Sequence, residues 1–394
     1  MSNLFEGLRV VDFTMNTAGP YATAMLADFG ADVIKIEKPK LGDDQRTYSP
    51  QMDGTAITFF WLNRGKKSIV LDMGDPAGVE IAKQLIAQAD VVAESFKPGT
   101  MAKFGLGYED VKKINPRVIY CSVSAYGQSG PMRGKPGYDV IAQALSGVMD
   151  LTGEPGGPPT RIGIHVADVS AGNHAFGAIA SALYYRERTG QGQHVDVALL
   201  DSIVAYNSFV ENNAAGHIVR RTGNNPPTLA PFGIFRGKQD YVIICAPNPK
   251  LWAGLCRAMG REELATDPQF STVVARVKNY PRMIELIENW LKTFDDIDVP
   301  VARLDKEGVP CAKINETRDL LANEQLLARD MIVDFATPAG TAMKVKGNPL
   351  KFSAVKADIK LPPALGQHQD EVLGKLGYSD AAIAELKERW HFSS

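Results

Sequence analysis

The fold class is decided by residues 8–37, LRVVDFTMNTAGPYATAMLADFGADVIKIE. The apolar run Leu8–Phe13 predicts a β-strand, the small-residue segment Pro20–Phe29 predicts a helix, and Ala31–Glu37 predicts a second strand. Together they form a β-α-β unit. Such a unit sets its two strands parallel, because the helix returns the chain to the same edge of the sheet.

The same alternation continues to about residue 200. Runs rich in Val and Ile are followed by segments with the spacing of helices. We expect strands at 68–72, 90–94, 118–124 and 194–198, and helices at 76–88, 109–114, 172–188 and 201–214. Strands that alternate with helices indicate an α/β fold whose parallel sheet is covered on both faces.

A chain of 394 residues exceeds the size at which one core usually stops growing, so a second domain is expected. The polar, turn-rich segment Arg220–Pro227 indicates a linker. A short strand pair, Ile234–Arg236 and Tyr241–Cys245, and amphipathic helices such as Met283–Thr293 follow it. We therefore predict a large domain at 1–215, completed by 330–394, and a linker with a smaller α+β domain at 216–329.

The charge balance excludes some partners. Lys and Arg number 43 against 45 Asp and Glu, so the net charge of -2 provides no broad basic field for nucleic acid. A small anionic ligand stays possible, and Arg64, Lys66 and Lys67 are either contacts for it or a solvated turn. The four cysteines form no zinc or redox motif. Without a charged leader or a long apolar segment, we expect a cytoplasmic protein that does not bind membranes.

Asp168 ends the apolar stretch Arg161–Asp168 and precedes a helix of small residues. Such junctions are where α/β proteins gather reacting groups, so Asp168 is a candidate nucleophile. The local pattern alone favours a structural role. Aspartate is a common N-cap, whose side chain binds the free amides of the first helical turn.

Two other patterns near Asp168 carry less chemistry. His165 and His174 bracket it without the close helical spacing of zinc enzymes, so we expect each to be a satisfied core or surface histidine and expect no metal site. The segment 124–131, SAYGQSGP, misses the spacing of a hydrolase nucleophile elbow and indicates a loop.

Further short segments, spread over nearly the whole chain, share one family pattern with Asp168. They are GLRVVDFT at 7–14, AGP at 18–20, GADVIKIE at 30–37, NR at 63–64, ESFKPG at 94–99, GLGY at 105–108, NPR at 115–117, YGQSGP at 126–131, YD at 138–139, TGQG at 189–192 and LGQH at 365–368. With these segments the sequence resembles the class III CoA-transferases, the family of formyl-CoA:oxalate, carnitine and related dicarboxylate CoA-transferases.

The resemblance implies a Rossmann-like large domain, a smaller α+β domain and two chains interlocked as rings in a homodimer. It also implies that acyl-CoA and a small carboxylic acid, such as oxalate or succinate, are the substrates, with no tightly bound cofactor. Asp168 would be the nucleophile, forming an acyl-aspartyl anhydride and then an aspartyl-CoA thioester. We further expect backbone amides near Ala171 and Gly172 to stabilise the developing oxyanion.

The family pattern also supplies candidate CoA contacts. Its CoA-binding positions correspond here to Asn16, Lys38, Leu71, Ser95, Phe96, Lys97, Lys103 and Tyr138. Phe96 is expected near the adenine and the lysines near the phosphates. Two departures stand out, because Ser95 replaces the family's usual Asn and Thr17 replaces a Gln of the oxalate enzymes. Oxalate specificity is therefore not implied.

Two other functions stay open. The related α-methylacyl-CoA racemase shares the fold and the aspartate but pairs it with the histidine of a Gly-His-Asp motif, which aligns with Gly137-Tyr138-Asp139. Tyrosine, with an ordinary pKa of about 10, is a poor base at neutral pH, which favours transfer over racemisation. The second alternative is a catalytically silent CoA-binding protein, and the presence of Asp168 argues against it.

Overall fold

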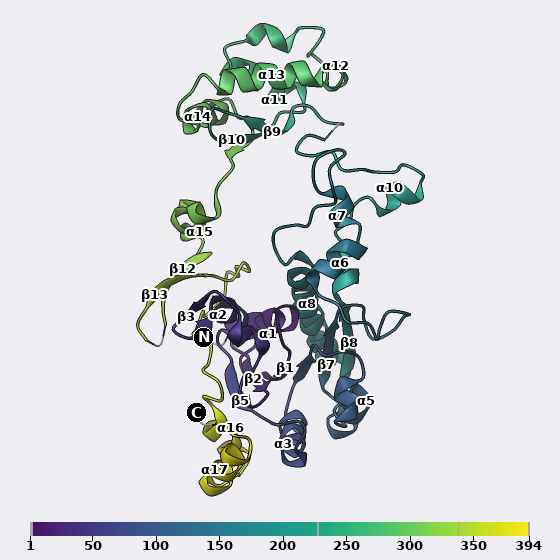
Figure 1. The fold of residues 1–394 in the computed structure, drawn as a ribbon, viewed down its shortest axis with the longest axis vertical. Coiled ribbons are helices and arrows are strands. Elements are labelled where there is room, and N and C mark those ends of the chain that lie inside the picture. The colour runs from purple at the N-terminus through teal and green to yellow at the C-terminus, as the bar shows by residue number, and fades with distance from the viewer. Residues whose placement is uncertain (1–2, 227, 338, 393–394) are drawn as a thin grey trace. The chain divides into compact units, whose positions relative to one another are not determined.

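The computed structural model describes residues 3–226, 228–337 and 339–392 (Figure 1). Pro227, the last residue of the predicted linker, lies outside these ranges. The chain divides into two compact units. Unit 1 consists of Met1–Gly147, Ile162–Ser208 and Asn323–Ser394, and unit 2 of Val148–Arg161 and Phe209–Ala322.

Unit 1 contains a six-stranded sheet in which every strand pair is parallel, which confirms the α/β prediction. The strand order is β5-β2-β1-β6-β7-β8. Numbered along the chain within this sheet, it is the 3-2-1-4-5-6 order of doubly wound nucleotide-binding folds. The strands are β1 (Arg9–Phe13), β2 (Asp32–Glu37), β5 (Lys67–Val70), β6 (Val91–Glu94), β7 (Ile119–Ser124) and β8 (Gln193–Ala198).

Helices cover both faces of this sheet (Figure 1). Strand residues such as Val11 and Val92 form one core with α3 (Pro76–Ala87), α5 (Tyr108–Ile114), α16 (Gln369–Lys375) and α17 (Asp380–Arg389). Asp12, next to Val11, points to the opposite face because side chains alternate along a strand. There it accepts a 2.8 Å hydrogen bond from Thr23 of α1 (Ala18–Asp28), and α8 (Val166–Thr189) packs against α1.

The remaining elements of unit 1 are short. They are η1 (Asp44–Thr47), β3 (Gln51–Met52), β4 (Thr55–Ala56), α2 (Ile57–Asn63), α4 (Thr100–Lys103), α6 (Asp139–Leu145), α9 (Leu199–Val204), α15 (Glu324–Ala328), β12 (Ile332–Ala336) and β13 (Ala342–Lys346). The single helix predicted at 201–214 is two helices, α9 in unit 1 and α10 (Val210–Ala214) in unit 2.

Unit 2 has its own apolar core and an antiparallel sheet of order β11-β10-β9. Trp252 and Phe235 are fully buried in this core. Its elements are α7 (Val148–Leu151), α10, β9 (Phe232–Arg236), β10 (Tyr241–Cys245), α11 (Pro249–Ala258), η2 (Glu262–Ala265), α12 (Val273–Lys278), α13 (Tyr280–Leu291), α14 (Asp298–Lys306), β11 (Cys311–Lys313) and η3 (Thr317–Ala322).

The basic cluster after α2 is structural rather than a ligand contact or a solvated turn. The guanidinium of Arg64 binds the buried Asp28 at 2.5 Å, and the ammonium of Lys66 binds the buried Asp12 at 2.9 Å. Burial lowers the pKa of Lys66 to about 8, against the opposing attraction of Asp12. Lys67 pairs with Asp32 at 2.9 Å.

The strand order reverses its direction between β1 and β6. In open α/β sheets such a reversal opens a crevice at the carboxyl ends of the strands, because the loops that follow the two strands run to opposite sides. Here these are the loop 14–17 after β1 and the loop 95–99 after β6. The fold therefore predicts a ligand site at these two loops.

Candidate functional site

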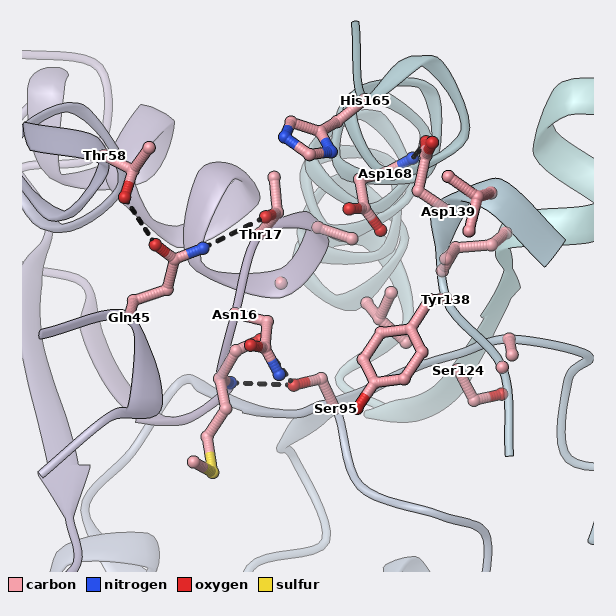
Figure 2. A pocket seen from close by; sticks show the side chains of 18 of the residues that line it. Asn16, Thr17, Gln45, Thr58, Ser95, Ser124, Tyr138, Asp139, His165 and Asp168 are labelled. Carbon is pink, nitrogen blue, oxygen red and sulfur yellow. Dashed lines mark hydrogen bonds between the residues drawn. The ribbon is translucent and has the colours of Figure 1, made fainter. Parts of the chain in front are cut away.

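A cavity of about 390 Å³ lies at this reversal point, within unit 1. Its walls are the loops after β1, β6 and β7 and the first residues of α6 and α8 (Figure 2). Asp168 lies on its wall, together with Asn16, Thr17, Ser95 and Tyr138. The cavity therefore gathers the candidate nucleophile and three of the predicted CoA contacts.

Asp168 is not the cap of its helix. Helix α8 begins at Val166, and His165 occupies the N-cap position without a side-chain hydrogen bond to the helix. The free amides of the first turn are bound by Asp139 of α6, whose Oδ1 accepts from Ala167 N at 2.7 Å and from Asp168 N at 3.1 Å. The carboxylate of Asp168 is thereby left available to the cavity, as Figure 2 shows.

The early start of α8 also corrects the prediction about the oxyanion. Ala171 and Gly172 lie beyond the first turn and are buried, so their amides fall within the helical hydrogen-bond pattern. Gly172 packs closely against α1, since a Cβ there would lie 2.8 Å from the Ala18 carbonyl oxygen. These amides are therefore not free to bind an oxyanion.

Asp139 is held in place by Gln143, one helical turn further along α6. The Gln143 side chain donates from Nε2 to Asp139 Oδ2 at 2.6 Å, and its Oε1 accepts from Ile162 N at 3.0 Å. Both side chains are buried. This contact fixes the carboxylate that caps α8, and it ties the segment before α8 to α6.

The environment of Asp168 favours its protonated form. Burial raises its pKa to about 7, and the nearby negative charge of Asp139 adds to the rise. A hydrogen bond from Thr17 acts in the opposite direction, because a hydroxyl donor stabilises the carboxylate. A carboxyl group with a pKa near 7 is partly ionised at neutral pH, which is characteristic of functional sites.

Thr17 is the end of a directed chain of hydrogen bonds. Thr58 Oγ1 donates to Gln45 Oε1 at 2.6 Å, and Gln45 Nε2 donates to Thr17 Oγ1 at 3.4 Å (Figure 2). The Thr17 hydroxyl, which accepts from Gln45, then donates to Asp168. The chain orients the hydroxyl toward the carboxylate.

Asn16 and Ser95 lie where the two loops meet. Asn16 has a left-handed backbone with φ of 63°, which Asn tolerates better than most residues. Its N–H donates to Asp43 Oδ1 at 3.3 Å, and its side-chain oxygen accepts from Tyr48 at 3.2 Å. Ser95 Oγ accepts from Met15 N at 2.8 Å, which joins the loop after β6 to the loop after β1.

A second cavity, of about 270 Å³, adjoins the first and shares Met15 with it. It is lined by Lys38, Leu71 and Phe96, which follow β2, β5 and β6 at the carboxyl edge of the sheet. Lys38 is exposed and pairs with Asp44 at 2.5 Å. The apolar Leu71 and Phe96 offer surfaces against which a flat ring can pack.

A third cavity, of about 200 Å³, shares Ser95 and Tyr138 with the first. Three exposed cations line it: the predicted Lys97, and Arg133 and Lys135, which no sequence motif singled out. Phe96 borders both this cavity and the second. Lys103, at the end of α4, lines none of these three cavities.

The two histidines near Asp168 have different surroundings. His165 is exposed and lines the first cavity beside Asp168 (Figure 2). His174 stacks against Tyr206, with ring centroids 5.8 Å apart. Within the described ranges, no group of three or more His, Cys, Asp or Glu side chains is arranged to hold a metal ion.

None of the helices in the described part of the chain is both long and apolar enough to cross a membrane. The fold and the site together define a doubly wound α/β protein with its ligand cavity at the reversal of strand order.

Comparison with known proteins shows to which family this α/β protein belongs. The model of CoA-transferase family III matches residues 5–369, and the chain belongs to this family. It is 36% identical to a human succinyl-CoA:glutarate CoA-transferase, over 98% of this chain and 90% of the relative. It is 40% identical to an acetyl-CoA:oxalate CoA-transferase of Acetobacter aceti, over 89% of each.

A solved structure agrees with this assignment. The crystal structure of a CAIB/BAIF family protein from Brucella suis is 38% identical to this chain, with a TM-score of 0.87. The match covers 95% of this chain and all of that chain. The resemblance seen in the sequence is thereby confirmed at the level of the family.

Several residues of the site could not be singled out from the sequence. Gln45 and Thr58 lie at no predicted strand end and in no motif. Their side chains nevertheless form the chain of hydrogen bonds that ends at Thr17. Arg133 and Lys135 lie between the motif at 126–131 and Tyr138. This position in the sequence was the available signal that they border the site. Gln143 lies four residues after Asp139, a spacing that places both on one face of a helix.

Proposed function

We propose that this protein transfers CoA from an acyl-CoA to a free carboxylic acid, with Asp168 as the nucleophile. The observation that carries the proposal is the Asp168 carboxylate at the cavity wall, with its amide bound by Asp139 and its oxygen by Thr17. A carboxylate used only as a helix cap would instead bind the amides that Asp139 occupies here.

The reaction proceeds by four acyl transfers. The Asp168 carboxylate attacks the acyl-CoA carbonyl, so the thioester breaks to give an acyl-aspartyl anhydride and CoA thiolate. The thiolate attacks the Asp168 carbonyl of the anhydride, forming the aspartyl-CoA thioester and releasing the donor acid. The acceptor carboxylate attacks this thioester, giving a new anhydride and the thiolate. The thiolate then attacks the acceptor's acyl carbonyl, which regenerates Asp168.

The residues around Asp168 support these steps in different ways. Thr17 favours the ionised carboxylate that must attack, while burial makes that anion less solvated and raises its energy. The fixed position of Asp168 on α8 supplies proximity, which offsets the weak nucleophilicity of a carboxylate. The bound substrates must also keep water from the anhydride, because water would hydrolyse it.

The three adjoining cavities offer a track for CoA. We propose that the adenine packs against Phe96 and Leu71, that Lys38, Lys97, Arg133 and Lys135 bind phosphates, and that the thiol end passes Ser95, Asn16 and Tyr138 toward Asp168. An extended ligand suits neighbouring cavities that share Met15, Ser95, Phe96 and Tyr138. Lys103 lies outside these cavities and attracts the CoA phosphates by its positive charge.

We propose a small dicarboxylate, such as oxalate or succinate, as the acid. Relatives named for glutarate and oxalate, at 36% and 40% identity, support this class. Thr17, in the place of a Gln of the oxalate enzymes, favours a longer diacid over oxalate.

The proposal is tested by label exchange. Purified protein is mixed with succinyl-CoA or acetyl-CoA and a panel of isotopically labelled carboxylic acids, and labelled acyl-CoA is measured by mass spectrometry. We expect transfer to small dicarboxylates by the wild type and none by Asp168→Asn, which still binds CoA. Full activity of the variant would refute the role of Asp168.

His165 beside Asp168 gives the racemase alternative an observation of its own, because an Asp and a His in one cavity can exchange an α-proton. Incubation of 2-methylacyl-CoA with the protein in D₂O separates the two functions. Deuterium at the α-carbon without CoA transfer would support racemisation, whereas transfer without deuterium supports the proposal.

A further inference from the structure

His165 is a polar side chain in the cavity to which the transfer mechanism assigns no role. It is the N-cap residue of α8, is exposed, and makes no side-chain hydrogen bond to the helix it precedes. Among the described residues that line this cavity, it is the one side chain able to carry a positive charge. The lining otherwise offers neutral polar groups and the carboxylates of Asp139 and Asp168.

The charges of the cavity change when Asp168 reacts. An acceptor acid enters after the aspartyl-CoA thioester has formed, when Asp168 no longer carries a charge. The two side-chain oxygens of Asp139 are occupied by the amides of α8 and by Gln143. A hydrogen-bond donor beside Asp168 would then bind the second, unreacting carboxylate of an incoming dicarboxylate.

Some neutral groups of the lining already donate to one another. The Thr58 hydroxyl donates to Gln45, and Gln45 donates to Thr17. His165, in contrast, presents a ring N–H in every protonation state, since imidazole has at least one. A hydrogen bond to a charged group is also stronger than one between neutral groups.

The placement of His165 suits a diacid that reacts at Asp168. Asp168 follows His165 by three positions at the start of α8, and both side chains line the same cavity. Figure 2 shows the imidazole and the carboxylate beside each other on the cavity side of α8. A linear diacid of four or five carbons can place one carboxylate at Asp168 and extend the other toward the ring.

We propose that His165 binds the distal carboxylate of a linear dicarboxylate acceptor and so determines specificity for diacids over monoacids. This inference rests on the proposed CoA transfer. His165 acts on the unreacting end of the substrate and takes no part in the acyl transfers at Asp168.

The test compares acceptors of matched shape, succinate against butyrate and glutarate against valerate, with His165→Leu. kcat/KM is measured for acids that turn over, and competitive inhibition constants for acids that do not. For the diacids, we expect His165→Leu to lower kcat/KM, or to raise the inhibition constant, by about 10-fold or more. For the monoacids, we expect these constants to change by less than about 2-fold. His165→Gln, which keeps an N–H donor, is expected to recover part of the loss.

His174→Leu is the matched control, because this histidine lies on the same helix but stacks against Tyr206 and does not line the cavity. His174→Leu should leave the ratio of kcat/KM for diacids to kcat/KM for monoacids unchanged. An equal loss for both classes in His165→Leu, or an unchanged ratio, would overturn the inference while leaving CoA transfer intact. Absence of transfer by the wild type to every acid would instead refute the proposed function.

Discussion

At the scale of single residues, the site depends on how the charge of Asp168 is balanced. Burial and Asp139 raise its pKa to about 7, and the Thr17 hydroxyl opposes them. In the proposed reaction the attacking form is the carboxylate, so we expect kcat/KM to fall as the pH drops below about 7. This acid limb is measured with saturating acceptor and limiting acyl-CoA.

Thr17→Val should move the acid limb to higher pH by about one unit, because the carboxylate loses a hydrogen bond that its protonated form does not need. The expected activity loss is therefore largest at pH 6 and smallest at pH 9. Thr17→Ser keeps the hydroxyl and serves as the control. A limb that stays in place in Thr17→Val would show that this hydrogen bond does not set the ionisation of Asp168.

The same raised pKa has a consequence for stability. The ordinary value of 3.8 applies to the unfolded chain, so the folded protein holds the proton more tightly and loses stability as the pH rises from about 4 to about 7. Asp168→Asn removes this loss. We expect the variant to raise Tm at pH 8 and to have little effect at pH 4.5. Equal Tm differences at the two pH values would argue against the raised pKa.

At the scale of elements, the site depends on the close contact of α1 and α8. A Cβ at Gly172 would lie 2.8 Å from both the Ala18 carbonyl oxygen and Tyr21 Cδ1. Gly172→Ala must therefore push the helices apart, and Thr17 precedes α1 while Asp168 lies one turn before Gly172. We expect a stability loss of about 1–3 kcal/mol in urea unfolding and a fall in kcat of roughly 10- to 100-fold.

Gly177 provides the control, because it also lies on α8 but has open space around it. A Cβ added at Gly177 would have no described atom within 4 Å apart from its chain neighbours and the backbone of its own helix. Gly177→Ala should stabilise the helix by up to about 1 kcal/mol and leave kcat unchanged. If Gly172→Ala behaved in the same way, the close contact would have no part in positioning Asp168.

Prediction from sequence worked best for elements whose signal is local. The apolar runs of β1, β2 and β7 each predicted a strand to within about one residue at either end. The start of α8 was wrong by six residues, since 172 was expected and Val166 is found. Its first amides are bound by Asp139, 28 positions before Ala167, and no local pattern reports such a distant acceptor.

The same distinction applies to the site. Asp168 could be singled out because it ends an apolar stretch before a helix of small residues, whereas the Thr58 and Gln45 chain arises only when η1 and α2 fold toward α1. The ion pairs of Arg64 and Lys66 are likewise formed with residues more than 30 positions away. Motifs and periodicity do not predict which residues become partners through tertiary packing.

At the scale of the whole molecule, the interlocked homodimer remains a prediction of the family resemblance. Exposed apolar side chains of unit 1, such as Ile141 and Leu145 on α6 and Tyr184 on α8, are consistent with burial by a second chain. Interlocked rings cannot separate without large unfolding. We expect a dimer by light scattering and no mixed dimers when two differently tagged preparations are incubated together and examined by native mass spectrometry.

A monomer, or mixed dimers that form within minutes, would contradict the interlocked arrangement. Tagged chains that are denatured together and refolded provide the control, because they must yield mixed dimers if the tags permit assembly.

The central claim is that Asp168 becomes covalently modified. Protein incubated with acyl-CoA alone, without acceptor, is treated with hydroxylamine, digested and sequenced by mass spectrometry. Hydroxylamine attacks an aspartyl thioester or anhydride and leaves a hydroxamate. The account predicts this hydroxamate at Asp168 in the wild type and its absence in Asp168→Asn. An active wild type whose Asp168 peptide stays unmodified, or a hydroxamate at a different carboxylate, would contradict the account.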